Sequence, residues 1–245
     1  MIKTVVILAA GTGSRLLLNN QSKPLHQLGA ESLIARHLRM FSARGVTRFV
    51  IVIGYMSDQV KAAVTAIKQD HYEVVFVENA EWTRGNGLSV LHARGDVNTD
   101  FFLIMADHIF EDAALDLFMK QGASDVSVTL AIDLPGPSNS HIDLDDVTKV
   151  KLNGDRVVDI GKSLTDYDAY DTGLFRCSTA LFDALKTSIS AGNESLSGGV
   201  LVLAQQGAIN TVSIHPYTWF DIDTPQDIIS AKQFLLRDMA AGALG

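Results

Sequence analysis

The sequence TVVILAAGTGSR at residues 4–15 carries most of the information about the fold. Residues 4–10 form a continuous run of β-branched and apolar side chains, the pattern of a strand buried on both faces. Gly11 and Gly13 follow at once, and a glycine turn lets backbone N–H groups come close to a phosphate chain and surround it. Arg15 and Lys23 add positive charge near this turn. The stretch therefore predicts a buried strand that leads into an anion-binding turn.

A glycine turn alone is compatible with several kinds of site. The dinucleotide-binding fingerprint needs a third glycine at position 16, which is Leu16, and the Walker loop needs Gly-Lys-Ser or Gly-Lys-Thr, which is absent. A tight turn with solvated Arg15 and Lys23 stays open as the alternative without a ligand. The charge distribution favours an anion site, because the first 30 residues contain Lys3, Arg15 and Lys23 but no Asp or Glu.

Strands and helices alternate along the next hundred residues. The helical segments have apolar residues three or four positions apart, and the strands are short β-branched runs. Because helices that separate strands form βαβ units, this pattern predicts a mainly parallel sheet. The strands are predicted at residues 49–53, 74–77 and 101–105, and the helices at residues 32–43, 57–67, around 88–91 and 113–120.

The second half of the chain does not continue the regular alternation of strands and helices. Asn153-Gly154 between two short strand-like runs predicts a hairpin with a tight turn. Thr224-Pro225 predicts the start of a last helix, since Pro is favoured at the first helical position. Neither an internal repeat nor a linker is evident, so we expect one domain over residues 1–245. The predicted elements are strands at residues 126–132 and 211–214, hairpin strands at 147–152 and 156–160, and helices at about 178–188 and 195–205.

The composition is that of an ordinary globular protein. Of the 245 residues, 47% are hydrophobic and 20% are charged, which excludes disordered, collagen-like and coiled-coil chains. The net charge of −8 argues against general nucleic-acid binding. The single cysteine, Cys177, excludes an internal disulfide and is predicted to be a buried thiol. No apolar run approaches the roughly 18 residues of a membrane span, and the N-terminus resembles a strand rather than a signal peptide, so we expect a soluble, cytoplasmic protein.

Three aspartates are candidate metal ligands, and one of them lies at the end of a predicted strand, where open α/β sheets bind their ligands. Asp107, followed by His108, comes directly after the fourth predicted strand, and a carboxylate there can hold Mg²⁺. Asp221 and Asp223 are two positions apart, so on an extended segment both side chains point to the same side. One of them could meet Asp107 across a metal ion. Asp227 falls in the first turn of the last helix, where the helix dipole is a sufficient reason for an acid.

Polar residues near the predicted hairpin form a second candidate group. Lys162 follows a strand and a glycine, where it could neutralise a second phosphate. Asp171 and Thr172 could hydrogen-bond the hydroxyl groups of a polar substrate. Taken singly, each of these residues also has an ordinary explanation as a solvated charge or a turn residue. The acids of the segment 143–146, Asp146 among them, lack the spacing of a calcium-binding loop and are interpreted as solvated loop charges.

Several motifs together resemble a known family. The segment LAAGTGSR at residues 8–15, a following KPL at 23–25, the aspartate after the fourth strand and a late DIDTP resemble the signature of the nucleotidyltransferases that make nucleotide-sugars and CDP-alcohols. From residue 3 to about 236 the chain is similar to the cytidylyltransferases that act on inositol 1-phosphate, whereas the phosphocholine cytidylyltransferases are similar over the first half. The segments that carry this similarity are NAEWTRGNGLS at 79–89, MADHIF at 105–110, IGK at 160–162, YDTG at 170–173 and WFDIDTP at 219–225.

The resemblance implies a fold and an activity. The fold is a Rossmann-like α/β domain with a mixed, mainly parallel sheet, in which residues of about 1–125 bind the nucleotide and about 126–240 the acceptor. The activity is Mg²⁺-dependent transfer of CMP from CTP to a phosphorylated alcohol, with inositol 1-phosphate as the first expectation. Phosphocholine, another head-group phosphate or a sugar 1-phosphate stay open as acceptors, and so does a non-catalytic nucleotide-sensing domain. Family habit also implies a separate membrane CDP-alcohol transferase that consumes the product.

The same resemblance implies residue roles. Lys23, Arg15 and Asp107 are expected to be catalytic, with Lys23 stabilising charge on the α-phosphate. The residues implied to hold the nucleotide are Leu8, Ala9, Ala10, Gly11, Thr12, Gly13, Ser14, Arg15, Lys23, Asn79, Gly85, Asn86 and Ser89. Those implied to bind the acceptor are His108, Lys162, Asp171, Thr172 and Gly173. The implied metal ligands are Asp107, Asp223 and, less directly, Asp221.

Overall fold

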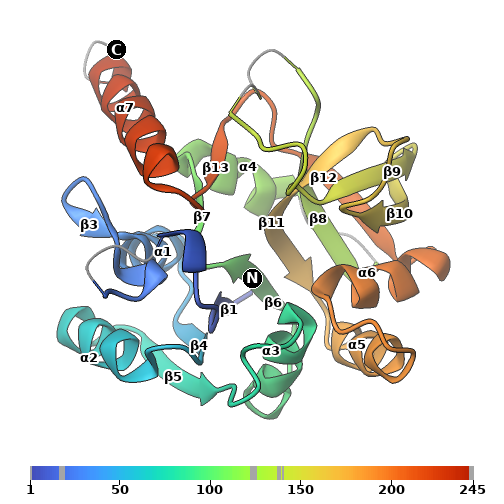
Figure 1. The fold of residues 1–245 in the computed structure, drawn as a ribbon, viewed down its shortest axis with the longest axis horizontal. Helices are drawn as coiled ribbons and strands as arrows, with labels where there is room; N and C mark the ends of the chain where they lie inside the picture. The colour runs from blue at the N-terminus through green and yellow to red at the C-terminus, as the bar shows by residue number, and fades with distance from the viewer. Residues whose placement is uncertain (1, 17–19, 122–125, 137–138, 140, 243–245) are drawn as a thin grey trace.

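A mixed β-sheet runs through the centre of the molecule (Figure 1), in the computed structural model that describes residues 2–16, 20–121, 126–136, 139 and 141–242. Within these residues the sheet has nine strands, whose order in space differs from their order in the chain. Across the sheet they are β5 (Glu73–Glu78), β4 (Arg48–Ile53), β1 (Thr4–Ala9), β6 (Phe101–Met105), β11 (Ala169–Cys177), β8 (Val128–Asp133), β12 (Ile209–Ser213), β10 (Arg156–Gly161) and β9 (Lys149–Asn153).

Parallel pairing builds the first half of the sheet, as the alternating pattern predicts. Strands β5, β4, β1 and β6 pair in parallel, with Val5 of β1 opposite Phe49 on one side and Phe102 on the other. Strand β11 then pairs antiparallel with both β6 and β8, and the hairpin of β9 and β10 adds further antiparallel pairs. The expected α/β fold with a mixed sheet is confirmed, with the antiparallel pairs concentrated in the second half.

The long strand β11 is not predicted by the residue pattern. Asp171, Thr172 and Gly173 interrupt the apolar run that marks a buried strand. In the structure the register of β11 against β8 shifts between Asp171 and Phe175. Such an irregularity re-aims side chains and is common beside functional sites. Here it falls in a segment that the sequence analysis expects to face an acceptor.

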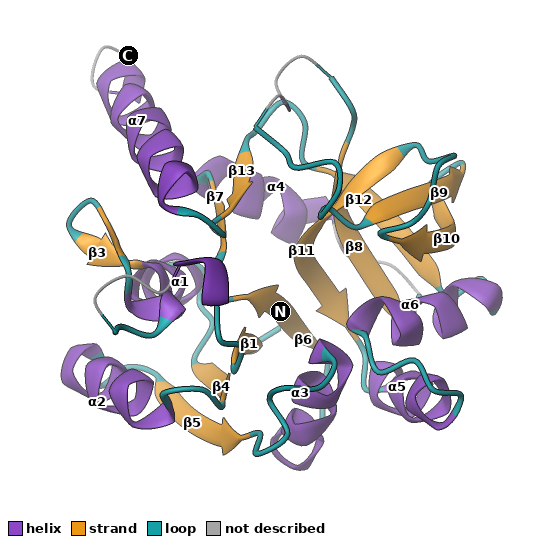
Figure 2. Cartoon of the chain, in the orientation of Figure 1, coloured by secondary structure: helices purple, strands orange, loops and turns teal. Residues whose placement is uncertain are grey.

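Helices cover both faces of the sheet (Figure 2). Alternate residues of β1 serve the two faces: Val5 and Ile7 join one hydrophobic cluster, whereas Val6 and Leu8 join the other. A strand between two apolar layers must be apolar on both sides, as the run at residues 4–10 predicts. One face packs against α1 (Leu33–Ser42), α2 (Ser57–Ile67) and α4 (Asp112–Gln121), and the other against α3 (Asn86–His92), α5 (Ala180–Ser190) and α6 (Leu196–Gln205).

A second, two-stranded sheet positions the acidic segments. Strand β7 (His108–Phe110) pairs antiparallel with β13 (Trp219–Asp221), which sets His108 opposite Asp221. The N–H of Ile222 also donates to the carbonyl of Asp107 at 3.0 Å. Helix α7 (Pro225–Gly242) starts shortly afterwards and extends away from the body of the molecule (Figure 1). The sequence does not predict this pairing, because strands of three residues are too short to show a period.

Two features of the fold remain to be described, namely the character of its helices and the surroundings of Cys177. No helix within the described ranges is long and apolar enough to cross a membrane. Cys177 ends β11 with 1% exposure, and burial raises the pKa of its thiol, which confirms the predicted buried cysteine.

The remaining elements are short. They are the 3-10 turns η1 (Ser14–Leu16), η2 (Lys23–Leu25) and η3 (Ala93–Asp96) and the hairpin of β2 (Gln27–Leu28) and β3 (Glu31–Ser32).

Candidate active site

The turn after β1 packs tightly against a lysine. Gly13 has a φ of +54°, and a Cβ atom added there would lie 2.6 Å from the Cβ of Lys23. That distance is well inside van der Waals contact, so glycine is needed both for the left-handed backbone and for the close approach. Lys23 begins η2, and its side chain is only 7% exposed. The predicted anion-binding turn and the predicted catalytic lysine therefore form one packed unit.

Lys23 joins two acidic segments that are far apart in the chain. Its ammonium lies 2.6 Å from Asp107 Oδ2, at the end of β6, and 2.6 Å from Asp223 Oδ1, just before α7. Burial alone would lower the pKa of Lys23, but the carboxylates of Asp107, Asp221 and Asp223 raise it above its ordinary value. The lysine is therefore charged at neutral pH. Asp107 and Asp223, expected from the sequence to be metal ligands, both contact its ammonium.

His108 lies between two carboxylates and a backbone carbonyl. Its Nδ1–H donates to the carbonyl of Thr172 at 2.7 Å, because a carbonyl can only accept. Its Nε2 lies 3.5 Å from Asp221 Oδ2 and 3.9 Å from Asp107 Oδ1. Burial would lower the pKa of His108, but Asp221 and then Asp107 raise it to about 10. Gly173 makes this position accessible: with φ at +75°, a Cβ there would lie 2.3 Å from His108 Nδ1.

Asp107, His108 and Asp221 form a group that could hold a metal ion. One ligand atom from each lies within 4.8 Å of the others. Asp107 Oδ1 and Asp221 Oδ1 are buried oxygens that have no hydrogen-bond partner among the described residues. Buried carboxylate oxygens without a partner are costly, and a cation is one way to satisfy them. The oxygens of Asp107 and Asp221 fit a hard divalent cation, whereas His108, whose pKa is raised to about 10, is protonated at neutral pH and pairs with the carboxylates instead of acting as a ligand.

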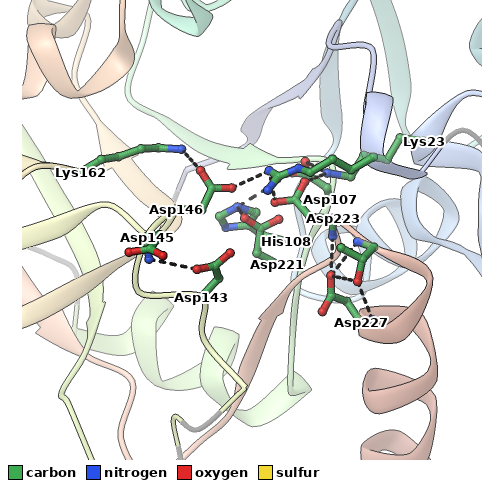
Figure 3. A network of polar contacts seen from close by, with 12 residues as sticks. Lys23, Asp107, His108, Asp143, Asp145, Asp146, Lys162, Asp221, Asp223 and Asp227 are labelled. Carbon is green, nitrogen blue, oxygen red and sulfur yellow. Dashed lines mark hydrogen bonds and ion pairs between the residues drawn. The ribbon is translucent and has the colours of Figure 1, made fainter.

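A chain of ion pairs continues from this group across the site (Figure 3). The guanidinium of Arg15 contacts Asp223 Oδ2 at 2.7 Å and also pairs with Asp146. Asp146 in turn pairs with Lys162. Hydrogen bonds from Lys162 and then Arg15 lower the pKa of Asp146 to about 2. The interpretation of Asp146 as a solvated loop charge was wrong: the fold returns its loop to the site, a contact that no local spacing reveals.

Asp227 positions the backbone beside Asp223. Its Oδ2 accepts from the N–H of Asp223 at 3.0 Å, and from the N–H and the hydroxyl of Thr224 at 2.6 and 2.9 Å. The N–H of Asp227 makes a long 3.4 Å contact with the Thr224 hydroxyl, completing a capping box. Asp227 thus lies at the start of a helix, where the sequence places it, and it also fixes the segment that carries Asp223.

Two adjoining pockets surround these residues. The glycine-turn pocket is lined by the turn after β1, Lys23, Trp82, Arg84 and residues of α3. The hairpin-side pocket is lined by Arg15, His108 and the acidic network, together with residues of β11 and α6. The two pockets share three lining residues, namely Asn86, Met105 and Asp107. A group bound in one pocket would therefore meet a group bound in the other beside Asp107.

Most of the residues expected at the nucleotide lie around the glycine-turn pocket. Asn79 is set back from it: the side chain is 1% exposed and donates to Ser89 Oγ at 2.9 Å. Gly85 packs against the backbone of Glu194. Arg15 lines the hairpin-side pocket, and Thr12 and Ser14 line neither. The predicted residues that do line the glycine-turn pocket are Leu8, Ala9, Ala10, Gly11, Gly13, Lys23, Asn86 and Ser89.

The residues expected at the acceptor gather around the hairpin-side pocket, with one exception. His108, Lys162, Asp171 and Gly173 line it. Burial raises the pKa of Asp171 to about 6, against the lowering effect of a hydrogen bond from the N–H of Gly173. The Thr172 hydroxyl, expected to bind substrate, instead donates to the carbonyl of Ala131 at 2.8 Å, and Thr172 is fully buried. Successive side chains of β11 point to opposite faces of the sheet, so the Thr172 side chain points away from the pocket that Asp171 and Gly173 line.

Trp82, Arg84 and Trp219 are among the further pocket-lining side chains that the sequence pattern did not predict. Trp82 and Arg84 line the glycine-turn pocket, and Arg84 pairs with Glu194 of the loop before α6. Trp219 lines the hairpin-side pocket, its ring 5.4 Å from that of His108 and its indole N–H donating to Asp133. All three belong to segments that carry the family resemblance, so their positions in those motifs were the available signal.

The fold and the paired pockets define an α/β protein with a candidate ligand site at the carboxyl ends of its parallel strands, where open α/β sheets bind their ligands. Comparison with known families makes the class specific. Residues 5–142 match the MobA-like NTP transferase domain, and the chain belongs to that family.

Individual relatives are consistent with this family. The chain is 31% identical to the bifunctional IPC transferase and DIPP synthase of Aquifex aeolicus, over 99% of this chain and 54% of that protein. It is 32% identical to the protein of the same name from Rubrobacter xylanophilus, over 96% and 52%. The chain thus spans about half the length of the curated relatives it matches. A solved inositol-1-phosphate CTP transferase from T. maritima has a TM-score of 0.80 and 25% identity, covering 95% of this chain and 96% of that one.

Proposed function

We propose that this chain transfers CMP from CTP to inositol 1-phosphate, releasing pyrophosphate. The observation that carries the proposal is that the glycine-turn pocket and the hairpin-side pocket meet at Asp107, with the buried cation Lys23 paired to that carboxylate. Such an arrangement suits a reaction between a triphosphate and a second phosphorylated ligand. The similarity to the T. maritima inositol-1-phosphate CTP transferase over nearly the whole of both chains supports the choice of substrates.

The proposed chemistry needs positioning and charge neutralisation rather than a strong base. A phosphate oxygen of the acceptor is already an anion, so it can attack the α-phosphorus of CTP directly. The new oxygen–phosphorus bond forms as the bond to the β-phosphate oxygen breaks, and pyrophosphate leaves with the electron pair. Lys23 and Arg15 provide fixed positive charge for the phosphates, and Lys162 provides it for the acceptor. The nucleotide would occupy the half of about residues 1–125 and the acceptor that of about 126–240.

The acidic group around Asp107 fits a divalent cation, which we propose is Mg²⁺. Asp107 and Asp221 have buried oxygens without a partner among the residues described, and Asp223 reaches the same lysine. These three aspartates would hold the ion. When bound, Mg²⁺ supplies charge neutralisation on the phosphates of the nucleotide. The residues of the chain keep the carboxylates in place through Lys23 and through the capping contacts of Asp227.

The assay that tests the proposal follows pyrophosphate release with CTP and Mg²⁺. The acceptors compared are inositol 1-phosphate, phosphocholine, glycerol phosphate and glucose 1-phosphate, and each of them is tested both with CTP and with UTP. Turnover with CTP and inositol 1-phosphate is the expected result. Turnover with another acceptor would keep cytidylyl transfer and replace the acceptor. Turnover only with UTP and glucose 1-phosphate would make the chain a sugar-phosphate nucleotidyltransferase, and no turnover with any pair would overturn the enzymatic proposal.

The proposal extends to the setting of the reaction. We propose that the chain works in the cytoplasm and that a membrane CDP-alcohol transferase consumes its product. A CDP-alcohol is an activated donor, because its cleavage releases CMP as a leaving group. Membrane fractions supplied with the product and an acceptor alcohol should therefore join the phosphorylated alcohol to that acceptor and release CMP, and fractions that leave the CDP-alcohol unchanged would contradict this extension.

Gly13→Ala is expected to lower kcat by about 100-fold, because a reacting group displaced by about an ångström has an effect of that size. The new Cβ would meet Lys23 at 2.6 Å and push it from Asp107. Gly29→Ala is the matched control: Gly29 also has a positive φ, +74°, but a Cβ added there would have nothing within 4 Å. Both variants should lose roughly 1–2 kcal/mol of stability to backbone strain. Steady-state kinetics and thermal melts separate the effects, and equal kcat values for the two variants would refute the role of the contact with Lys23.

A further inference from the structure

The hairpin-side pocket contains a carboxylate that the proposed reaction does not use. Asp146 lies in the loop before β9, and its two oxygens contact different cations: Oδ1 pairs with Lys162 and Oδ2 with Arg15. Arg15 follows β1, and Lys162 follows β10. One carboxylate therefore connects a cation of the nucleotide half to a cation of the acceptor half (Figure 3).

The position of Asp146 is built into the backbone around it. Lys149, which is 8% exposed, donates from its ammonium to the carbonyls of Leu144 and Lys162, at 2.7 Å each. The N–H of Val147 also donates to the carbonyl of Asp143 at 2.9 Å. A buried ammonium thus ties the loop that carries Asp146 to the strand end that carries Lys162. The contact between Asp146 and Lys162 therefore depends on the backbone that Lys149 holds in place as well as on the two side chains themselves.

The two cations remain available to a stronger anion. The side chains of Arg15 and Lys162 are 52% and 60% exposed, whereas that of Asp146 is 26% exposed. Ion pairs that water reaches contribute little to stability and exchange readily. A phosphate carries more charge than a carboxylate and offers more acceptor oxygens to the same donors. A bound phosphate can therefore replace the Asp146 carboxylate between Arg15 and Lys162.

We propose, resting on the proposed function, that Asp146 stands in for the acceptor's phosphate between Arg15 and Lys162 and competes with it. Asp146 then lowers the occupancy of this position by any phosphate, and the acceptor offsets that loss through the contacts of its hydroxyl groups. An acceptor that also contacts the pocket through its hydroxyl groups displaces the carboxylate, whereas free phosphate, which has only charge to offer, is held off. Asp146 therefore raises the concentration at which inorganic phosphate occupies the site. The acceptor still binds, because its hydroxyl groups add contacts that inorganic phosphate lacks.

Asp146→Asn tests the competition, with inorganic phosphate as the calorimetric probe at pH 7.5. Removing the carboxylate charge should tighten phosphate binding about three- to tenfold, the range expected when two exposed ion pairs no longer have to be broken. Asp145→Asn is the matched control, because Asp145 is an exposed neighbour with the same charge and has no ion pair with Arg15 or Lys162. In the double variant Asp146→Asn with Lys162→Met the gain should disappear, which locates it in this pocket.

Kinetics provide a second readout. In Asp146→Asn the KM for the acceptor should fall while kcat does not rise, and inorganic phosphate should become a stronger competitive inhibitor. If Asp146→Asn binds phosphate no tighter than Asp145→Asn, the carboxylate organises the cations instead of competing for them, and the proposal is wrong. Phosphate binding does not require turnover. A chain that fails to turn over CTP but shows the gain in Asp146→Asn would overturn the proposed function and leave the competition standing.

Discussion

A Lys23→Met variant is expected to fold normally and to lose about 10²–10³-fold in kcat with CTP and inositol 1-phosphate, the usual cost of removing one preorganised donor. Methionine keeps the apolar stem that packs against Gly13 but removes the ammonium. That ammonium is 2.6 Å from both Asp107 and Asp223, so the variant leaves the carboxylates without their shared cation. It also removes the positive charge closest to the junction of the two pockets, where charge would develop on the α-phosphate.

Comparing kcat with KM locates the effect of Lys23. A loss confined to kcat means that the ammonium acts mainly in the transition state, whereas a rise in KM alone would mean that it only binds CTP. Lys61→Met on α2 is a suitable control, because Lys61 pairs with Glu78 away from the site. Circular dichroism and thermal melts check the fold of both variants. A folded Lys23→Met protein with nearly normal kcat would exclude Lys23 from the mechanism.

The elements that could be predicted from the sequence are those whose pattern is local. The run at residues 4–10 predicts a strand with two buried faces, and β1 contributes to both hydrophobic clusters. Asn153-Gly154 predicts a hairpin, and β9 and β10 pair around it. Strand β11 could not be predicted with its boundaries, because its polar centre and its register shift remove the apolar run. The pairing of β7 with β13 joins segments about a hundred residues apart, and neither carries a period of its own.

The residues of the candidate site also fall into those that a local motif predicts and those whose position depends on the fold. Residues in recognisable motifs, such as Lys23, Asp107 and Asp223, come together in the structure. Asp146 was missed because its contacts depend on the position of a loop, which hydrogen bonds from the buried Lys149 ammonium hold in place. Thr172 was predicted to face a substrate, but strand alternation directs its hydroxyl to Ala131. Motif position predicted which residues would gather at the pockets, whereas side-chain direction required the three-dimensional fold.

Asp107→Asn should combine a loss of turnover with a loss of metal affinity. Asp107 Oδ2 accepts from Lys23 at 2.6 Å, and Oδ1 has no hydrogen-bond partner within the described part of the chain. Asparagine keeps the shape but removes the negative charge that a hard divalent cation prefers. We expect kcat to fall about 10²–10³-fold. We also expect Mn²⁺, used as a paramagnetic substitute for Mg²⁺, to bind at least about tenfold more weakly, since even changes beyond the direct ligands have effects of that size.

The metal measurement separates two roles that turnover alone would confuse. Asp107 could act as a ligand or could only hold Lys23 in place, and either loss would lower kcat. Electron paramagnetic resonance of bound Mn²⁺ distinguishes them, with Asp183→Asn on α5 as the control for charge, because Asp183 is exposed and pairs with Arg94. If Asp107→Asn binds Mn²⁺ as Asp183→Asn does while kcat collapses, Asp107 acts through Lys23. If both properties fall together, the Asp107 carboxylate acts as a metal ligand.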